Sequence, residues 1–145
     1  MITIEDYFGP RLGNPDATPD MHERAIALLD NVNSMLDAAC LPIEDGGAGY
    51  LAPTDKDTGT QVSGSKGGSG DGGFRPHDAK TGGPGSKHRQ AQAVDVYDPE
   101  DVLDNWLTDD KLHRFGLFRE HPEDTPGWCH LQTVPPGSGR RTFKP

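Results

Sequence analysis

Residues 44–86 are rich in glycine and poor in apolar side chains, and this stretch limits how the rest of the chain can fold. Most of the chain's 19 glycines lie in it, while hydrophobic residues make up only 32% of the sequence. A connection this long without a helix is unusual in a compact domain and is commonly a functional loop or disordered. Composition alone fits a low-complexity linker over residues 59–73 equally well. The sequence leaves open whether residues 59–73 become ordered over a ligand.

The length of 145 residues indicates one domain, 1–145, because two domains of this composition would each lack the apolar surface for a core. Residues 1–17 mix a few apolar side chains with proline and glycine, which predicts an irregular N-terminal arm. We expect this arm to pack Ile4, Tyr7 and Phe8 on the body of the domain.

A long amphipathic helix is predicted to follow the arm. Thr18 can cap its first turn, and Pro19 stands where a missing N–H has no consequence. Apolar side chains then recur at steps of three and four residues, which is the spacing of one helix face. The pattern ends near Pro42, so we predict one helix that supports the core. Its apolar positions are Ala25, Leu28, Leu29, Val32, Leu36 and Ala39.

The second half of the chain predicts three strands and two short helices. Residues 92–97 alternate as a strand does, and Asp98, followed by proline and acidic residues, begins a helix. Thr108 begins a second short helix. Residues 117–120 and 128–132 predict two further strands that pair antiparallel. The expected fold class is α+β, a small antiparallel sheet with helices packed on it and one long glycine-rich loop.

Charge and hydropathy exclude two kinds of partner. The formal net charge of −9 argues against nucleic acid, whose binding proteins concentrate lysine and arginine on one face. The one basic cluster, Arg140, Arg141 and Lys144, is typical of a solvated tail. The sequence begins without a signal-peptide pattern and has no apolar run long enough to cross a membrane. We therefore expect synthesis in the cytoplasm and no membrane insertion.

Both cysteines are expected to be free thiols, because Cys40 and Cys129 form neither a CxxC pair nor a disulfide framework. Cys129 precedes His130, but neighbouring residues of a strand point to opposite faces. This argues against a Cys–His nucleophile.

Two of the six histidines stand next to or within predicted strands. His88 precedes the strand that carries Asp95, and His130 lies in the last strand. Two imidazoles and a carboxylate are typical of catalytic zinc, which takes three protein ligands and keeps one position open for water. The odd separation of His88 and Asp95 requires a bend, which we place at residues 90–92. The spacing alone leaves open the alternative that His88 and His130 are ordinary buried or exposed histidines that bind no metal. The other four are expected to be solvent-exposed: His22, His77, His113 and His121.

The residues around these three positions resemble a known family. Segment 86–95, SKHRQAQAVD, resembles the SxHxxGxAxD motif of the D-alanyl-D-alanine carboxypeptidase family of zinc peptidases, related in fold to the Hedgehog signalling domain. Residues 128–131, WCHL, resemble that family's second metal-binding motif, and residues 73–75, GFR, its upstream GYR element. The three elements span residues 73–132, and the tail 136–143 is similar to small bacteriophage members.

The resemblance implies a Hedgehog/DD-peptidase-like fold and one Zn²⁺ ion held by His88, Asp95 and His130. It also implies that Arg75 steadies the developing oxyanion or a substrate carboxylate. Ser86 would orient the site from behind the metal ligands.

The chain departs from the family pattern at two places. Ala91 takes the place of the motif's glycine. The family's general base precedes the last ligand by two or three residues, where this chain has Gly127 and Trp128, which cannot transfer a proton. Glu120 is our candidate for the base, because its strand is predicted to pair with that of the last ligand, and Glu123 is the second choice.

These implications give one hypothesis, a zinc metallopeptidase, carboxy- or endopeptidase, that hydrolyses an amide bond in bacterial peptidoglycan peptides. The expected setting is a bacteriophage, whose enzyme is made in the host cytoplasm and acts at the cell wall as an endolysin or is carried in the virion. The alternative is a catalytically inactive, zinc-stabilised binding module or a virion structural protein. A lack of any carboxylate near the metal would favour the alternative.

Overall fold

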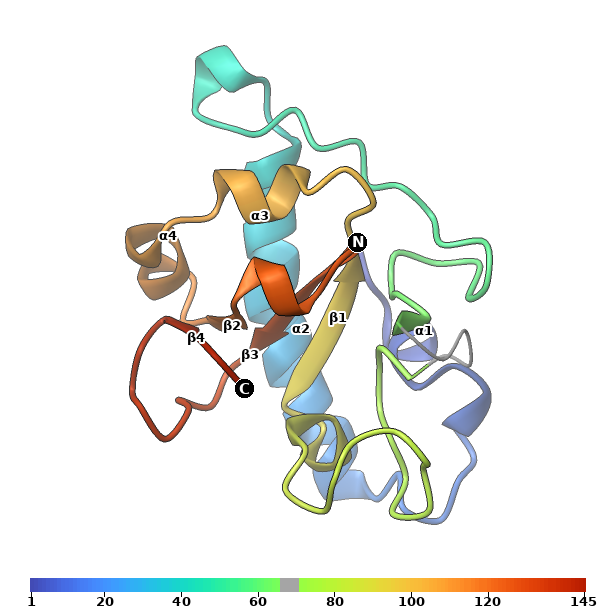
Figure 1. Ribbon diagram of the computed structural model, residues 1–145. Helices are drawn as coiled ribbons and strands as arrows, with labels where there is room; N and C mark the ends of the chain where they lie inside the picture. Colours follow the sequence, from blue (N-terminus) through green and yellow to red (C-terminus); the bar gives the residue numbers. More distant parts are fainter. Residues whose placement is uncertain (66–70) are drawn as a thin grey trace.

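The computed structural model describes residues 1–65 and 71–145. It has an α+β fold in which a four-stranded sheet lies against one long helix and shorter elements surround both (Figure 1). The α+β prediction is thus confirmed. No helix in the described part of the chain is long and apolar enough to cross a membrane. The strands, in sheet order, are β1 Ala93–Tyr97, β3 Trp128–Gln132, β2 Phe118–Glu120 and β4 Thr142–Phe143.

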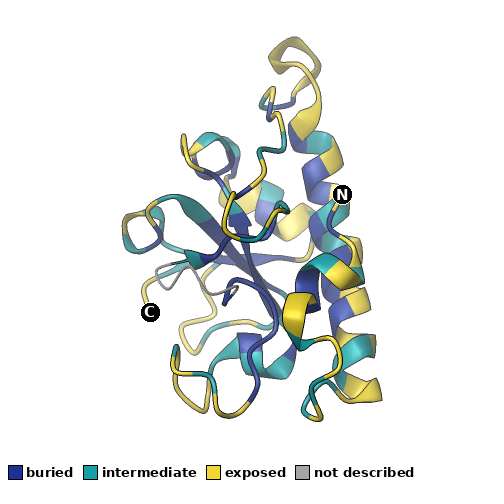
Figure 2. Cartoon of the chain, turned by 90° about the vertical axis from the view of Figure 1, so that its right-hand side faces the viewer, coloured by how far each residue is buried: buried dark blue, intermediate teal, exposed yellow. Residues whose placement is uncertain are grey.

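Helix α2, Pro19–Cys40, is the long helix that the sequence predicted. The hydroxyl of Thr18 accepts a hydrogen bond from the Met21 N–H at 3.3 Å, so the predicted cap is present. One face of the helix is buried and the opposite face exposed, which appears as alternating dark blue and yellow along the helix in Figure 2. All six predicted apolar positions are buried, together with Met35. The helix therefore supplies a large part of the core.

The N-terminal arm is more regular than predicted. Residues Ile4–Phe8 form helix α1, which begins with a capping box between Thr3 and Asp6. The reciprocal bonds of this box satisfy N–H groups that so short a helix would leave unpaired. The expectation of an irregular arm is wrong here for that reason. The expected packing is confirmed, since Tyr7 and Phe8 are each only 1% exposed and the half-buried Ile4 packs against the core.

The sheet is mixed rather than wholly antiparallel. Strand β3 pairs antiparallel with both β1 and β2, as predicted, but β4 pairs parallel with β2. Strand β4 has only two residues in a proline- and glycine-rich tail, so it has no alternating pattern to reveal it. The tail is also not simply solvated, because the Arg141 guanidinium lies 4.1 Å from the centre of the Phe118 ring.

Two short helices, α3 Val102–Trp106 and α4 Asp109–Arg114, follow β1. The hydroxyl of Thr108 accepts the Lys111 N–H at 3.2 Å, which confirms the predicted start of α4. Helix α3 begins later than predicted, after Asp101, and the carboxylate of Asp98 accepts the main-chain N–H of Asp104 at 3.1 Å. In the described part of the chain the single-turn 3-10 helices are η1 Gly9–Arg11, η2 Ile43–Asp45, η4 Lys87–Gln90 and η5 Pro122–Asp124.

The described part of the glycine-rich stretch covers the free edge of β1. The Ser63 N–H donates to the Asp95 carbonyl at 2.8 Å, and the Asp95 N–H donates to the Gly72 carbonyl at 2.7 Å. A Cβ at Gly72 would lie 1.9 Å from the Ser63 carbonyl oxygen, so only glycine fits there. The linker alternative is therefore wrong for residues 59–65 and 71–73, and residues 66–70 lie outside the described part.

Candidate metal centre

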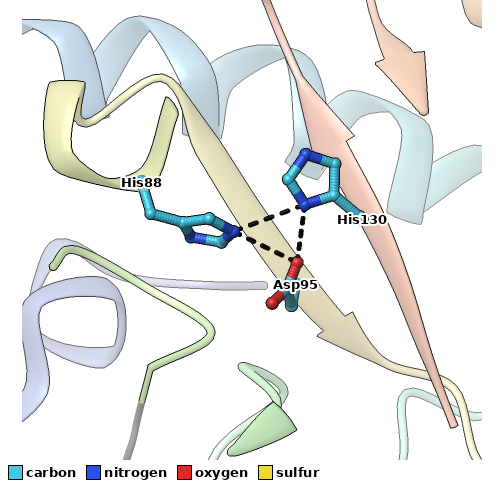
Figure 3. A group of neighbouring side chains, drawn as sticks. All are labelled: His88, Asp95 and His130. Carbon is cyan, nitrogen blue, oxygen red and sulfur yellow. Dashed lines mark hydrogen bonds and ion pairs between the residues drawn. The ribbon is translucent and has the colours of Figure 1, made fainter. Parts of the chain in front are cut away.

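Three buried side chains, His88, Asp95 and His130, point toward one another beside the sheet (Figure 3). The Nε2 atom of His88 lies 3.3 Å from both Nδ1 of His130 and Oδ1 of Asp95, and the latter two atoms lie 2.8 Å apart. Donors bound tetrahedrally to zinc at about 2.0–2.1 Å are about 3.3 Å from one another. The three residues are thus close enough to bind one metal ion, as the sequence predicted.

Strand pairing fixes two of the three candidate metal ligands. Asp95 and His130 lie directly opposite each other in the β1–β3 register. The main-chain groups of Asp95 bond to Ser63 and Gly72 on the other side of β1, so the pair occupies a non-hydrogen-bonded position of this ladder. Side chains approach most closely at such positions, where the Cα atoms are about 4.5 Å apart. A shift of the β1–β3 pairing register by one residue would place the two side chains on opposite faces of the sheet.

His88 reaches the centre from the 3-10 turn η4 rather than from the start of a strand. The chain bends at Ala91, whose φ of 54° lies in the left-handed region. The bend predicted at residues 90–92 is therefore confirmed, although it is a left-handed turn and not a bulge. A non-glycine residue in this conformation is strained by about 1–2 kcal/mol, whereas glycine adopts it freely.

Hydrogen bonds on the outer side of each imidazole direct a bare nitrogen inward. Nδ1 of His88 lies 2.9 Å from the Gly73 carbonyl, which can only accept. Nε2 of His130 lies 3.0 Å from Oε1 of Gln132, whose amide group donates to the Val134 carbonyl. Each neutral imidazole therefore carries its proton outward. In this arrangement the lone pairs of the Asp95 carboxylate and of the two imidazoles point at one another and repel. A proton on His130 or a shared metal ion removes this repulsion.

The surroundings keep Asp95 ionised. Burial opposes ionisation, but a proton on His88 or His130 holds the pKa of Asp95 well below its usual range, first through the charge on His88 and then through the hydrogen bond from His130. The hydroxyl of Ser65 also donates to Oδ2 at 2.6 Å, and the Arg75 guanidinium lies 3.6 Å from the same oxygen. Oδ1 is left to face the two histidines. Burial lowers the pKa of His88, which favours the neutral form that a metal requires.

A cavity of about 470 Å³ opens onto the three ligands and brings in other predicted residues. Arg75, Ser86 and Glu120 all line it. The Arg75 side chain is buried, and its Nε donates to the Asp71 carbonyl at 2.6 Å, so the guanidinium is held in place. Ser86 is half-buried and directly precedes the η4 turn that carries His88.

The two candidate bases differ in position. Glu120 is half-buried at the end of β2 and lines the cavity, and burial raises the pKa of its carboxyl group. Glu123 is outside the cavity lining, its side chain is 76% exposed, and its carboxylate pairs with Lys144 at 3.1 Å. Of the two candidates, Glu120 lines the cavity and Glu123 does not.

Three residues near the centre were not predicted. Ser65 and Gln132 bond to ligands, and Phe143 lies edge-on to the His130 ring with the ring centres 6.3 Å apart. Gln132 was findable, since it stands two residues after His130 and therefore on the same strand face. Ser65 and Phe143 come from irregular segments without a pattern that predicts their direction.

The remaining histidines and the cysteines lie away from this centre. Cys129 is buried on the opposite face of β3, its pKa raised first by burial and then by the neighbouring Asp104. Both cysteines are free, as predicted. His77 and His113 are exposed as expected, whereas the other two are half-buried. Of these two, His22 stacks on Phe8, with ring centres 4.4 Å apart.

Comparison of the chain with family models, curated proteins and solved structures finds no match in any of the three.

Proposed function

We propose that this protein is a zinc-dependent peptidase that hydrolyses an amide bond in bacterial peptidoglycan peptides. One observation carries the proposal, namely that the three converging donors open into a cavity that also holds a half-buried carboxylate and a buried guanidinium. Hydrolytic zinc sites need such ligands and a nearby carboxylate, because three protein ligands leave a position for water while a base moves its proton.

Zinc is preferred over other metals on the strength of the sequence motif. Two histidines and one carboxylate also suit iron(II) in oxygenases, so the donor set leaves both metals open. The resemblance of residues 86–95 to the zinc-peptidase motif favours zinc. The left-handed φ of Ala91 supports that resemblance, because the motif has glycine at this position and glycine adopts this φ without strain. A bound zinc ion would activate water near neutral pH and polarise the scissile carbonyl.

Glu120 would act as the general base. Its carboxyl group lines the cavity and is half-buried, and a pKa raised by burial brings it closer to the range in which a base works efficiently. The carboxylate would accept a proton from the attacking water and return it to the leaving amine. The strand β2 that carries it pairs with β3, which carries His130.

Arg75 would stabilise the negative charge that develops on the carbonyl oxygen, or bind a carboxylate of the substrate. Its position is fixed by Asp71 and Asp95 before a substrate enters. Such preorganisation lets a charged donor stabilise a transition state without rearrangement. Ser86 lines the same cavity and would help to hold the η4 turn.

The biological setting that we propose is a bacteriophage endolysin or a wall hydrolase carried in the virion. This part of the proposal is supported by the resemblance of residues 73–132 and of the tail to that family. A bacteriophage enzyme of this kind would act on the peptide stems of the cell wall.

The experiment that tests the proposal is mass spectrometry of purified peptidoglycan after incubation with zinc-loaded protein. We expect new peptide fragments that a chelator abolishes and that His88→Ala does not produce. Iron bound in place of zinc after expression would overturn the metal assignment. Folded, zinc-bound protein that releases no fragments from several wall types would instead indicate the inactive binding module.

A further inference from the structure

We propose that Phe143 determines which side chain the enzyme accepts beside the scissile bond, and that it selects an apolar side chain over glycine. The inference rests on the proposed function and extends it to a segment, residues 136–143, that contributes no metal ligand. Phe143 is half-buried and lines the cavity that opens onto the metal centre.

The C-terminal segment is fixed in place by several contacts. The Arg119 N–H donates to the Arg141 carbonyl at 2.8 Å, and the His121 N–H donates to the Phe143 carbonyl at 2.7 Å. The Arg141 guanidinium packs on the Phe118 ring and donates to the Leu117 carbonyl at 3.0 Å. Phe143 therefore forms a stable part of the cavity wall.

The ring of Phe143 lies next to the position where the reaction would occur. Its centre is 6.3 Å from that of the His130 ring, and the two planes are 88° apart. His130 also provides the Nδ1 atom of the metal centre. A substrate whose carbonyl approached the metal would therefore place a neighbouring side chain within reach of the Phe143 ring.

The lining of the cavity contains both apolar and cationic side chains. Trp128, Pro136 and Phe143 provide apolar surface from the C-terminal third, which also contributes the polar side chains of Glu120, Thr125 and Gln132. Arg75 and Lys87 bring cationic groups from the segment before β1, where hydroxyl groups also line the cavity. A peptide whose carboxylate or carbonyl oxygens faced these cations would place an apolar side chain toward Phe143. A methyl group in such a pocket changes specificity by about 10- to 200-fold.

The test uses two phosphinate pseudodipeptides that cannot be hydrolysed, one built on alanine and one on glycine. Calorimetric titration of the zinc-loaded full chain measures the affinity ratio of the two compounds. We expect the wild-type protein to favour the alanine compound at least tenfold, and Phe143→Ala to bring the ratio close to one. Phe143→Leu should retain part of the preference. Lys144→Ala changes the residue directly after this segment, outside the cavity lining, and should leave the ratio unchanged.

The outcomes separate this inference from the proposed function. An unchanged affinity ratio in Phe143→Ala, with zinc still bound and wall peptides still cleaved, overturns the role of Phe143 alone. Binding of neither compound and an absence of wall cleavage overturn the peptidase proposal and this inference with it. If Phe143→Ala does not fold, the ratio in Phe143→Leu decides, because leucine keeps an apolar residue in β4 but removes the ring. A ratio equal to that of the wild type then contradicts the inference.

Discussion

Replacement of Gln132 by leucine is expected to weaken zinc binding without removing a ligand. The side chain is 4% exposed, and its Oε1 accepts the outward proton of His130 at 3.0 Å. Leucine has a similar volume but no acceptor, so Nε2–H of His130 would be buried without a partner. Such a loss costs about 1–3 kcal/mol. Because about 1.4 kcal/mol corresponds to a tenfold change in affinity, zinc affinity should fall by about 5- to 150-fold.

This range agrees with the 10- to 100-fold loss of metal affinity that is typical when a residue behind a ligand is changed. The assay is a competition titration with a chromophoric chelator at fixed pH. Gln132→Glu provides the opposite test, because a carboxylate behind His130 should make the imidazole a stronger ligand and raise the affinity. Gln61→Leu is a matched control, since among the described residues Oε1 of Gln61 has no hydrogen-bond partner.

A zinc affinity of Gln132→Leu within twofold of the wild type would refute the reasoning. It would mean either that His130 does not bind the metal through Nδ1 or that the Gln132 bond does not orient it. Retained secondary structure, measured by circular dichroism, is needed before a weaker affinity is assigned to the lost bond.

Three further results are expected. Glu120→Gln should retain zinc, because Glu120 is not among the three clustered ligands, but should lower turnover of wall peptides by about 10²- to 10⁴-fold; an active variant would exclude it as the base. Arg75→Ala should reduce turnover more than zinc affinity, and unchanged kinetics would remove Arg75 from the site. Burial raises the pKa of Asp104 from 3.8 to about 6. Protonated Asp104 therefore contributes to the free energy of unfolding below about pH 4, and this contribution is lost as the pH rises through 6. The free energy of unfolding can be measured by urea titration with chelator present. Between pH 4 and pH 7 the free energy of unfolding of Asp104→Asn should rise, relative to that of the wild type, by on the order of 3 kcal/mol. A difference between the two proteins that does not change with pH would contradict this assignment.

The elements that the sequence predicted well are those with strong local signals. Helix α2 has both a threonine cap and a long apolar face, and the central strands have alternating residues bounded by turns. The cluster of His88, Asp95 and His130 was predicted because two histidines and a carboxylate beside neighbouring strands are a typical metal-binding donor set. His88 needed a bend to face Asp95, and that requirement followed from the period of a strand alone.

The elements that escaped prediction depend on contacts distant in sequence. Strand β4 exists because a two-residue tail segment pairs with β2, and its residues show no pattern of their own. Ser65 reaches Asp95 because the glycine-rich stretch runs along the edge of β1, where main-chain bonds and not side chains hold it. The start of α3 was misplaced because Asp98 accepts an N–H from the first turn of a helix that begins only at Val102, four residues later.

Because Asp95 pairs with His130 across two strands, their relative position does not depend on the length of the chain that connects them. Both ligands are placed by the ladder between β1 and β3, and the connection contains α3, α4 and β2. Loops within this connection could lengthen or shorten during evolution without moving either ligand, provided that the strand register is kept. Inserting or deleting a single residue within β3 ahead of His130 would be far more harmful. The geometry of the three-residue cluster therefore tolerates most changes in loop length and is sensitive to insertion or deletion at very few positions.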